Sequence, residues 1–486
     1  MIEFKNVSFK YNESTQLLDD VNLKIEDGEI VLLCGESGCG KSTLLRMINA
    51  LIPNYYKGEL KGSVRINGID TVTGELYKIA EQVSSVFQNP KTQFYNIESN
   101  EEMVFSLENR GISRSEMEKR LKCTVDKLGM EKLLERNLFA MSGGEKQKVA
   151  CACADTAATP IIVLDEPSSN LDLKSIEELA EIIGQWKKEG KTVVVAEHRL
   201  YYMLPIADRV IYMKEGKIES EFTSDELIAL SRERISEMGL RSTDIFNISL
   251  SKSMEKSHKF MRIKDFSYRY KGSKEPSFSV NDLTVPQSSI ICIIGDNGAG
   301  KSTFARTLCG LDRHAKGALE YDSRILKRKD RLKKTFMVMQ DTTHQLFTDE
   351  VSDELRSCAG ADSSDSDELI SNIIRELNLT DKESRHPQSL SGGEKQRVAI
   401  GTAMVAKRDV IVFDEPTSGL DYKNMTAVAD ILRKLKASGK TVFIVTHDPE
   451  LIAMCCDAYI RIGNGRIIES GEMTDEVYRE WLRGYK

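Results

Sequence analysis

The chain has 486 residues, of which 40% are hydrophobic and 29% charged, and its formal net charge is −7. This length accommodates two or more domains with full cores, and the acidic balance argues against a nucleic-acid-binding protein, which usually carries a basic surface. The apolar runs, such as Ile30 to Cys34, fall far short of the roughly 18–20 residues that span a bilayer, and the N-terminus lacks the apolar region of a signal peptide. We therefore expect a cytosolic protein whose membrane role, if any, comes through a partner.

The ten cysteines give no sign of a metal or redox site. Cys151 and Cys153, and the adjacent Cys455 and Cys456, lack the spacing of a zinc site or of a redox-active thiol pair. Most of the cysteines stand beside apolar residues. We expect reduced, mostly buried thiols without chemistry of their own.

An internal repeat decides the domain organisation. The segment GESGCGKST, which starts at Gly35, recurs as GDNGAGKST from Gly295, an offset of 260 residues. Further along, SGGEKQ and a strand followed by Asp-Glu-Pro recur at a constant offset of 249 residues. Two copies that differ by a few loop lengths explain these offsets. We predict domains over residues 1–232 and 259–486, joined by a linker at 233–258 that contains many serines and mixed charge.

In chain order, each copy predicts an α/β fold. Apolar strands (IVLLC and IICII) precede a glycine-rich loop and then a helix (LLRMINAL and FARTLCGL). Later apolar runs, such as residues 161–164 and 193–195, are short, continuous and separated by helical stretches, a pattern typical of a parallel sheet covered on both faces. The segment 101–139 has helical spacing and few β-branched residues, which indicates a helical subdomain inserted into each sheet domain.

Each glycine-rich loop fits G-x-x-x-x-G-K-[ST], the pattern of a phosphate loop between a strand and a helix. The glycines let backbone amides surround phosphate oxygens at the helix N-terminus, the lysine reaches the β- and γ-phosphates, and the serine holds Mg²⁺. Chance would give this pattern on the order of once per hundred chains of this length, so two copies in register argue against a coincidental turn. The predicted ATP-binding residues are Gly35, Glu36, Ser37, Gly38, Cys39, Gly40, Lys41, Ser42 and Thr43 in the first copy, and Gly295, Asp296, Asn297, Gly298, Ala299, Gly300, Lys301, Ser302 and Thr303 in the second.

A pair of glutamines follows a short apolar run in each copy. Gln88 and Gln93 lie in VFQNPKTQFYN, and Gln340 and Gln345 lie in VMQDTTHQLFT, 252 residues further on. Polar amides at the end of an apolar strand are poorly suited to a core. Their duplication therefore raises the question of what they do.

The motif SGGEKQ precedes a helix of small residues in each copy. A serine and two glycines at a helix start offer exposed amides and a hydroxyl group, which together can bind a second anion. A simple N-cap followed by a glycine turn would explain one occurrence, but not its duplication in a chain that also carries two phosphate loops. We expect Ser142, Gly143, Gly144 and Glu145, and Ser391, Gly392, Gly393 and Glu394, to contact nucleotide.

An Asp-Glu pair ends an apolar strand in each copy, and a histidine follows 33 residues after the aspartate. A strand-end carboxylate lies beside the phosphate loop at the carboxyl edge of the sheet, where Asp165 and Asp414 would support Mg²⁺. The next residue is well placed to activate water against the γ-phosphate, and an imidazole there can hold that water in line. The predicted catalytic residues are Glu166, Glu415, His198 and His447.

Taken in this order and duplicated, the motifs resemble the ATP-binding cassette (ABC) ATPases over nearly the whole chain except the linker. The resemblance implies two tandem phosphate-loop domains, each with a mostly parallel sheet core, an antiparallel β edge and an inserted helical subdomain. It also implies that each ATP lies between one half's phosphate loop and the other half's SGGEKQ motif, with Tyr11 or Tyr270 stacked on adenine. Asp172 and Asp421 match the loop that crosses this interface in the family. The Mg²⁺ ligands implied by the resemblance are Ser42, Gln88 and Asp165 in one site, and Ser302, Gln340 and Asp414 in the other.

The chain departs from the family pattern at the signature motif. Glu145 and Glu394 replace the usual glutamine, and Met141 replaces the usual leucine. The Ser-Gly-Gly amides are retained, so we expect nucleotide binding to survive. Both copies also keep the glutamate and the histidine, which predicts two competent sites.

The two glutamines in each copy, and AEHR around His198, resemble the energy-coupling factor importers of vitamins and metal ions. In the family the loop after Gln88 or Gln340 docks on the membrane partner, which answers the question that the paired amides raise. The resemblance implies a peripheral ATPase on the cytoplasmic face of the membrane, with a transmembrane coupling protein and a substrate-binding membrane protein as partners and no nucleic acid. The alternatives are a ribosome-associated tandem cassette protein, the fused ATPase of a sugar importer and a catalytically silent binding module.

Overall fold

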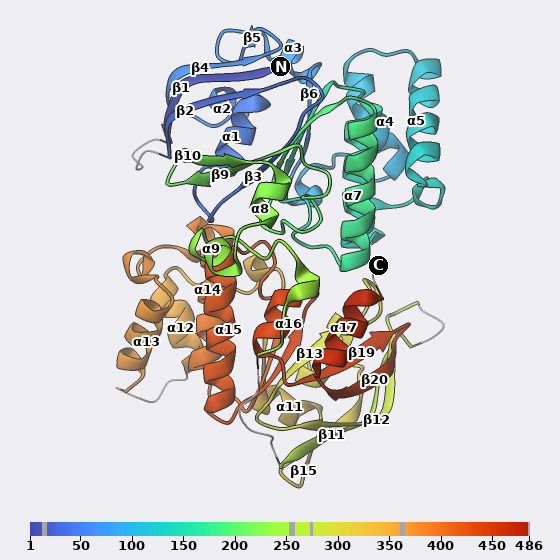
Figure 1. Ribbon diagram of the computed structural model, residues 1–486. Helices are drawn as coiled ribbons and strands as arrows, with labels where there is room; N and C mark the ends of the chain where they lie inside the picture. Colours follow the sequence, from blue (N-terminus) through green and yellow to red (C-terminus); the bar gives the residue numbers. More distant parts are fainter. Residues whose placement is uncertain (12–16, 252–257, 273–275, 360–364, 485–486) are drawn as a thin grey trace. The chain divides into compact units, whose positions relative to one another are not determined.

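The computed structural model describes residues 1–11, 17–251, 258–272, 276–359 and 365–484 (Figure 1). The chain forms two compact units: the first is Met1–Ile245 with Gly419–Lys423, and the second is Phe246–Ser418 with Asn424–Lys486. The domain limits that we predict at residues 232 and 259 stay predictions. Residues 252–257 of the predicted linker lie outside the described residues.

The first unit contains ten strands and nine α-helices among its described residues. The strands are β1 (Ile2–Tyr11), β2 (Leu18–Ile25), β3 (Ile30–Cys34), β4 (Gly58–Ile66), β5 (Ile69–Asp70), β6 (Val83–Val86), β7 (Ile161–Asp165), β8 (Thr192–Ala196), β9 (Arg209–Lys214) and β10 (Lys217–Phe222). The helices are α1 (Lys41–Ile48), α2 (Leu51–Asn54), α3 (Leu76–Ala80), α4 (Ser99–Asn109), α5 (Arg114–Leu128), α6 (Gly143–Thr156), α7 (Leu173–Lys188), α8 (Ser224–Ile228) and α9 (Arg232–Glu237).

Two sheets organise the first unit. An antiparallel sheet has the order β2-β1-β4-β5, and a six-stranded sheet has the order β10-β9-β3-β8-β7-β6. In the six-stranded sheet β9, β3, β8, β7 and β6 pair in parallel, and only β10 is antiparallel. The carboxyl ends of four neighbouring parallel strands, β3, β8, β7 and β6, therefore meet at one edge of the sheet.

Alternate residues of the central strands enter two separate cores, as expected for a sheet that is buried on both faces. Val31 and Leu33 of β3 pack with α1 and the antiparallel sheet. Ile30 and Leu32 pack with the apolar face of α7, which includes Trp186. The continuous apolar runs in the sequence are explained by this double burial.

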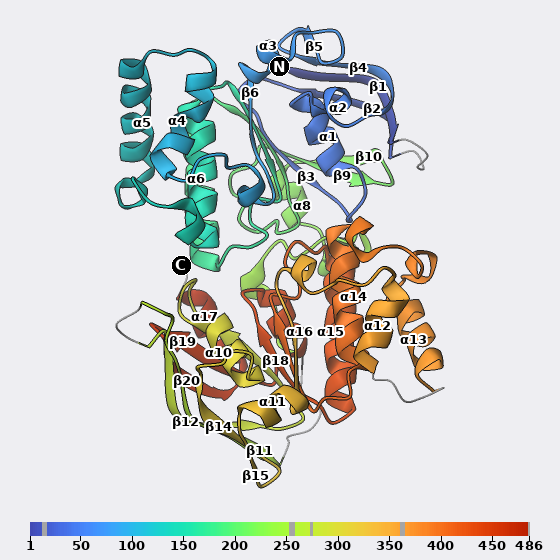
Figure 2. The same ribbon diagram turned by 180° about the vertical axis from the view of Figure 1, so that it is seen from behind.

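The helical subdomain of the first unit is built from α4, α5 and α6, which pack against one another (Figure 2). Its core contains Met103 from α4, Val125 from α5 and Val149 from α6. The helix α6 also contacts β6 and α7, so it joins this subdomain to the six-stranded sheet.

The second unit repeats this arrangement. Its strands are β11 (Phe260–Tyr268), β12 (Phe278–Pro286), β13 (Ile290–Ile294), β14 (Lys316–Tyr321), β15 (Arg324–Leu326), β16 (Thr335–Val338), β17 (Val410–Asp414), β18 (Thr441–Val445), β19 (Ala458–Gly463) and β20 (Arg466–Glu472). Its helices are α10 (Lys301–Cys309), α11 (Arg328–Lys334), α12 (Val351–Ala359), α13 (Asp365–Glu376), α14 (Gly392–Val405), α15 (Tyr422–Ala437), α16 (Pro449–Cys455) and α17 (Asp475–Arg483).

A single bridge between Ser279 of β12 and Arg466 of β20 joins both sheets of the second unit into one sheet of ten strands. The parallel order β13-β18-β17-β16 matches β3-β8-β7-β6 of the first unit. The predicted fold class, two α/β domains with an antiparallel β edge and an inserted helical subdomain, is confirmed.

All ten cysteines lie among the described residues and are free thiols. Seven are buried, Cys153 and Cys358 are half-buried, and Cys123 is exposed. Burial raises the pKa of Cys34, Cys151 and Cys309 to about 12, which keeps these thiols protonated at neutral pH.

Within the described ranges, no helix is both long and apolar enough to cross a bilayer.

Candidate nucleotide site

The predicted site residues of the first unit follow the four strands whose carboxyl ends meet. The phosphate loop follows β3, His198 follows β8, Glu166 follows β7, and Gln88 follows β6. Because these strands are neighbours, residues that are up to 163 positions apart in the sequence come together at one edge of the sheet.

The phosphate loop has the backbone that its glycines require. Gly35 has φ 144°, and a Cβ atom there would overlap the carbonyl oxygen of Met213. Gly40 has φ 107° and is the residue before α1. The Lys41 ammonium donates to the carbonyls of Gly35 (2.9 Å) and Glu36 (3.0 Å), which holds the loop curled at the helix N-terminus. This geometry suits an anionic ligand.

Hard oxygen donors lie beside this loop. The hydroxyl group of Ser42 donates to Oδ1 of Asp165 at 2.8 Å. Burial and the adjacent carboxylate of Glu166 raise the pKa of Asp165 to about 6. Two neighbouring, poorly solvated carboxylates and a hydroxyl group form a donor set suited to a divalent cation such as Mg²⁺.

Glu166 occupies a strained backbone position. Its φ is 43°, which is in the left-handed region that side chains rarely adopt, and its amide donates to the carbonyl of Ala196 at 2.8 Å. The side-chain Nε2 of Gln88 donates to Oε2 of Glu166 at 2.6 Å, and Nε2 of His198 lies 3.4 Å from Oε1 of Glu166. Burial alone would raise the pKa of Glu166, but His198 and Lys41 outweigh it and lower the pKa, so the carboxylate is ionised at neutral pH.

The second unit reproduces this geometry. Lys301 donates to the carbonyls of Gly295 (2.7 Å) and Asp296 (2.9 Å). Glu415 has φ 49°, and Nε2 of His447 lies 3.8 Å from its Oε1. Burial raises the pKa of Asp414, and a hydrogen bond from Ser302 partly offsets this effect. Gln340 follows β16, as Gln88 follows β6.

The SGGEKQ motifs begin helices α6 and α14. Ser142 is the N-cap of α6, its hydroxyl oxygen accepts from the amide of Glu145, and the Glu145 carboxylate accepts from the amide of Ser142. Ser391 and Glu394 form the same capping box on α14. The glutamate that departs from the family pattern therefore has a structural role, since it completes the N-terminus of the helix.

The two predicted adenine-stacking tyrosines differ in their contacts. The hydroxyl group of Tyr11 accepts from Arg46 at 3.2 Å, whereas that of Tyr270 lies 3.1 Å from the hydroxyl group of Thr303. Each ring also packs edge-on against an aromatic neighbour two residues earlier. Their role toward adenine stays a prediction.

The second glutamine of each pair braces the loop that carries the first. Oε1 of Gln93 accepts from the amide of Phe87 at 3.2 Å, and its Nε2 donates to the carbonyl of Ser85 at 3.1 Å. Gln345 makes the same two bonds, with Met339 (2.9 Å) and Met337 (3.2 Å). These glutamines therefore fix the backbone next to Gln88 and Gln340.

Sequence reasoning missed a buried glutamate that supports the same loop. Glu102 accepts from the amides of Tyr95 (2.9 Å) and Asn96 (2.7 Å), and Glu354 accepts from those of Phe347 (2.9 Å) and Thr348 (3.0 Å). Each glutamate stands nine residues after its second glutamine. This common register was the signal that could have revealed them.

The residues that the structure brings together fit Mg²⁺·ATP. A curled glycine loop at a helix N-terminus suits phosphate, and the hydroxyl, amide and carboxylate oxygens beside it suit Mg²⁺. A phosphate loop, a strand-end carboxylate pair and a histidine at the edge of a parallel sheet define a phosphate-loop nucleoside triphosphatase.

Comparison with known proteins specifies the family. A family model described as ABC transporter matches residues 18–169 and 278–418. A Treponema denticola protein described as an ABC transporter ATP-binding protein is 41% identical over 98% of this chain and 99% of its own length. A Vibrio vulnificus protein with the same description is 32% identical over 98% of this chain and 90% of its own length. The chain belongs to the ABC transporter ATP-binding proteins, and it is an ATP hydrolase that binds ATP with Mg²⁺.

Solved structures share the fold. The archaeal ribosome recycling factor aABCE1, in complex with ribosomal stalk protein aP1, has a TM-score of 0.63 at 23% identity and covers 96% of this chain and 90% of that one. The RNase-L inhibitor has a TM-score of 0.64 at 22% identity and covers 99% of this chain and 93% of that one. At this level of identity the likeness extends to the fold alone.

Proposed function

We propose that the protein is the ATP-hydrolysing subunit of an ABC-type importer of the energy-coupling factor kind, which takes up a vitamin or a metal ion. It drives a separate membrane-embedded partner from the cytoplasmic face of the membrane. Two findings support this proposal: the relatives are described as transporter proteins, and a groove lies beside the glutamine loop of the first unit.

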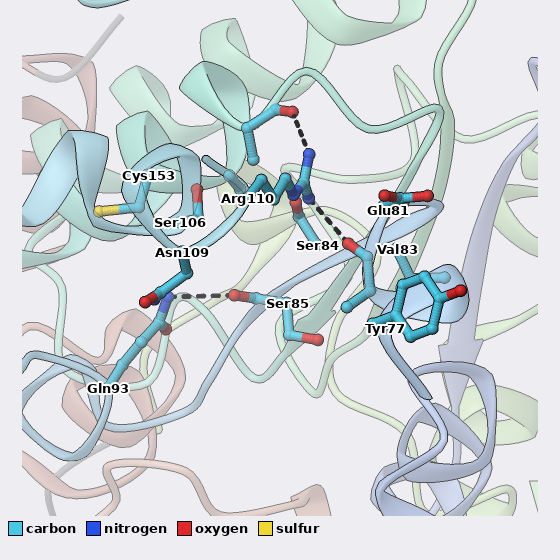
Figure 3. A pocket seen from close by; sticks show the side chains of 13 residues that line it. Tyr77, Glu81, Val83, Ser84, Ser85, Gln93, Ser106, Asn109, Arg110 and Cys153 are labelled. Carbon is cyan, nitrogen blue, oxygen red and sulfur yellow. Dashed lines mark hydrogen bonds between the residues drawn. The ribbon is translucent and has the colours of Figure 1, made fainter. Parts of the chain in front are cut away.

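The groove has a volume of about 660 Å³. It lies between the strand β6 and the helices α3, α4 and α6, and it is lined by Tyr77, Ala80, Glu81, Val83, Ser84, Ser85, Gln93, Ser106, Asn109, Arg110, Cys153, Ala154 and Ala157 (Figure 3). Arg110 donates to the carbonyls of Ala157 (3.0 Å) and Ala80 (2.8 Å), which ties both walls together. A groove of this size and mixed polarity suits a short helix of a partner.

Exposed aromatic side chains stand near this groove in the sequence. Tyr95, two residues after Gln93, is 80% exposed and stacks on Phe105 of α4 with 5.3 Å between ring centroids. Tyr77, which lines the groove, is 59% exposed. Aromatic surface beside a groove favours a protein–protein contact over a solvated face.

Hydrogen bonds connect the groove to the hydrolytic carboxylate. Gln93 lines the groove and bonds the backbone of Phe87, and the next residue, Gln88, donates to Glu166. A partner segment that shifts Gln93 therefore also shifts Gln88 and Glu166. This connection supports a coupling in which the binding of a partner at the groove and the binding of nucleotide affect each other.

The residues of the first unit divide the chemistry as follows. Lys41 and the loop amides bind phosphate, Ser42 and Asp165 hold the cation, and the ionised Glu166 accepts a proton from water at its carboxylate. His198, which lies within 3.4 Å of Glu166, orients that carboxylate. When bound, Mg²⁺ offsets the negative charge on the phosphate oxygens. The second unit uses Lys301, Ser302, Asp414, Glu415 and His447 in the same roles.

The proposal retains two ATP sites, each shared between the phosphate loop of one half and the SGGEKQ motif of the other. This sharing rests on the resemblance to the family. Fluorescent ATP binding tests it, because a bulky Ser391→Trp substitution should then weaken the site that uses Lys41. If it affects only the site that uses Lys301, the sharing is wrong.

Affinity purification from the native cell tests the transport role. We expect integral membrane proteins to copurify with the tagged chain. Asn109→Trp should fill the groove and abolish copurification while basal ATP hydrolysis stays within about twofold, since Asn109 is exposed and distant in sequence from the hydrolytic residues. The matched control is Glu108→Trp, an exposed neighbour that does not line the groove.

A ribosome-associated role is the second candidate, because tandem proteins of that kind share the fold. The net charge of −7 weighs against it, since ribosomal RNA attracts basic surfaces. Copurification of ribosomes in place of membrane proteins would favour it. The identity of the membrane proteins would also separate a vitamin or metal-ion importer from a sugar importer.

A further inference from the structure

A buried carboxylate stands directly before His198. Glu197 is 2% exposed and accepts four hydrogen bonds. Its Oε1 accepts from the amides of His198 (2.7 Å) and Arg199 (3.2 Å), and its Oε2 accepts from the amide of Ser168 (3.2 Å) and the hydroxyl group of Tyr202 (2.8 Å). One side chain therefore joins the histidine backbone to the loop that follows β7.

The buried side chain of Arg199 donates hydrogen bonds to the backbone of the same loop. It is 6% exposed, and its Nη1 donates to the carbonyls of Ser168 and Leu171, both at 3.2 Å. This loop runs from Glu166 to Asp172, the N-cap of α7. The two N–H groups of this one nitrogen, Nη1, hold the two carbonyls in fixed positions.

The loop has further bonds to the hydrolytic glutamate. The amide of Ser169 donates to the carbonyl of Glu166 at 3.2 Å, and the amide of Glu166 donates to the end of β8. The segment that carries Glu166 is therefore anchored at its start by β8 and along its length by Glu197 and Arg199. A displacement of this loop would move the Glu166 carboxylate.

In the second unit, different residues bond the loop that follows β17. At the positions of Glu197, Arg199 and Tyr202 it has Thr446, Asp448 and Leu451. Asp448 is fully buried, its Oδ2 accepts from the hydroxyl group of Thr417 at 2.7 Å, and its Oδ1 accepts from two amides of α16. The carboxylate stands after the histidine instead of before it. The Glu197–Arg199 pair is therefore not a requirement of the fold.

We propose that Glu197 and Arg199 are positioning residues for ATP hydrolysis in the first unit. They hold the loop of residues 166–172 and the backbone of His198 in one fixed arrangement, so that Glu166 meets its water in the productive geometry. The proposal rests on the hydrolytic roles of Glu166 and His198 given above. Neither Glu197 nor Arg199 needs to touch nucleotide for this purpose.

Steady-state kinetics of Arg199→Ala tests the proposal. In a Glu415→Gln background, which leaves hydrolysis to the first unit, we expect Arg199→Ala to lower kcat for ATP hydrolysis about 10- to 100-fold relative to Glu415→Gln alone, the usual effect of misplacing a catalytic group by about an ångström, while KM changes less than about threefold. Arg199→Lys should recover part of kcat, because an ammonium group can still reach one carbonyl. An unchanged kcat, or an increase in KM alone, would overturn the proposal.

Hydrogen exchange supplies a readout that does not depend on activity. In Arg199→Ala, amides in residues 166–172 should exchange at least about tenfold faster, while those of β7 and β8 keep their protection. Loss of protection throughout the first unit would instead indicate general destabilisation and contradict a positioning role. Arg234→Ala is the control, since Arg234 is exposed and pairs only locally with Glu237.

A variant that copies the residues of the second unit into the first keeps the test valid if Arg199→Ala misfolds. The combination Ser168→Thr, Glu197→Thr, Arg199→Asp and Tyr202→Leu gives the first unit the arrangement of the second. It should restore loop protection and, in the Glu415→Gln background, at least a third of the kcat of Glu415→Gln alone. If it is as impaired as Arg199→Ala, the two arrangements are not equivalent and the proposal is wrong. If the double variant Glu166→Gln with Glu415→Gln hydrolyses ATP normally, the catalytic assignment fails, but the exchange measurement still decides whether Arg199 holds the loop.

Discussion

The phosphate loops of the two units are nearly identical, but their helical subdomains are attached to the sheets by different means. In both loops the lysine donates to two carbonyls at 2.7–3.0 Å, and in both units the glutamate after the strand has a positive φ. In the first unit, however, Asp155 of α6 accepts from Thr124 (2.6 Å) and Lys127 (2.6 Å) of α5 and from Trp186 (2.9 Å) of α7.

The second unit replaces this polar cluster by apolar side chains. Ile373, Met404 and Leu435 occupy the positions of Thr124, Asp155 and Trp186. Ile373 and Leu435 are buried. Nucleotide chemistry demands particular groups at particular places, whereas the join between subdomain and sheet requires only that volume be filled and polar groups be satisfied.

The residues that line the groove of the first unit also differ from those at the corresponding positions of the second unit. Ser84 and Ser85 of β6 correspond to Phe336 and Met337 of β16, and Tyr77 and Glu81 correspond to Lys329 and Lys333. A partner that engages both units would therefore meet a polar, partly acidic surface on one and an apolar, basic surface on the other.

The largest expected effect tests the part that the two units share. The double variant Glu166→Gln with Glu415→Gln should lower ATP turnover by at least ~10²-fold, because each site loses its general base. Each single variant should reveal whether the sites contribute equally, as their matched geometry indicates. Phosphate release measures the rate, and Glu181→Gln, an exposed change on α7, is the control. Wild-type turnover in the double variant would favour a catalytically silent module.

The next effect concerns the polar cluster that only the first unit has. Asp155→Met alone should destabilise the protein by about 3 kcal/mol, since it leaves buried donors without their acceptor. The triple variant Thr124→Ile, Asp155→Met and Trp186→Leu, which copies the second unit, should come within about 1 kcal/mol of the wild type. Urea unfolding measures both. If the triple variant is the less stable of the two, filling volume is not sufficient.

A smaller effect concerns the matched glutamine braces. Gln93→Ala and Gln345→Ala each remove two hydrogen bonds to the backbone, and each should cost about 1–2 kcal/mol of local stability. Hydrogen exchange of the residues around Gln88 and Gln340 measures this cost. Because the bonds are the same in both units, the two losses should agree. A loss in one unit only would show that the loops are not equivalent.

The smallest effect is a difference in acid stability. Burial alone would raise the pKa of Asp155, but hydrogen bonds from Lys127 and Thr124 outweigh it and lower the pKa below its ordinary value of 3.8. The ionised carboxylate therefore contributes stability above about pH 4 that is lost as the pH falls through the lowered pKa. Acid unfolding followed by circular dichroism should show the triple variant to be less sensitive than the wild type in this range. If the triple variant and the wild type unfold at the same pH, the stabilising role of the ionised Asp155 is contradicted.

Much of the fold and of the candidate site could be predicted from the sequence. The fold class, the two phosphate loops, the strand-end carboxylates and the histidines depend on local patterns and on the repeat, and the family and its activity followed from them. The limits of the domains and the roles of individual site residues stay predictions.

The remainder depends on contacts that no local pattern encodes. Arg199 looks like an ordinary residue at a strand end until its guanidinium group is seen to reach carbonyls 28 and 31 positions earlier. Asp155 sits in a helix of small residues, and only the packing of α5 and α7 supplies its three donors. The register of Glu102 and Glu354 was visible in the repeat, but their function required knowledge of where the loop amides point.

The left-handed backbone at Glu166 and Glu415 has a wider consequence. A non-glycine residue in this region carries a cost of roughly 1–3 kcal/mol, so both units would be more robust with glycine in its place. Selection for stability alone would therefore favour the loss of these two hydrolytic carboxylates. Attempts to make the protein more heat-tolerant should leave these two positions untouched and seek their gains in the helical subdomains.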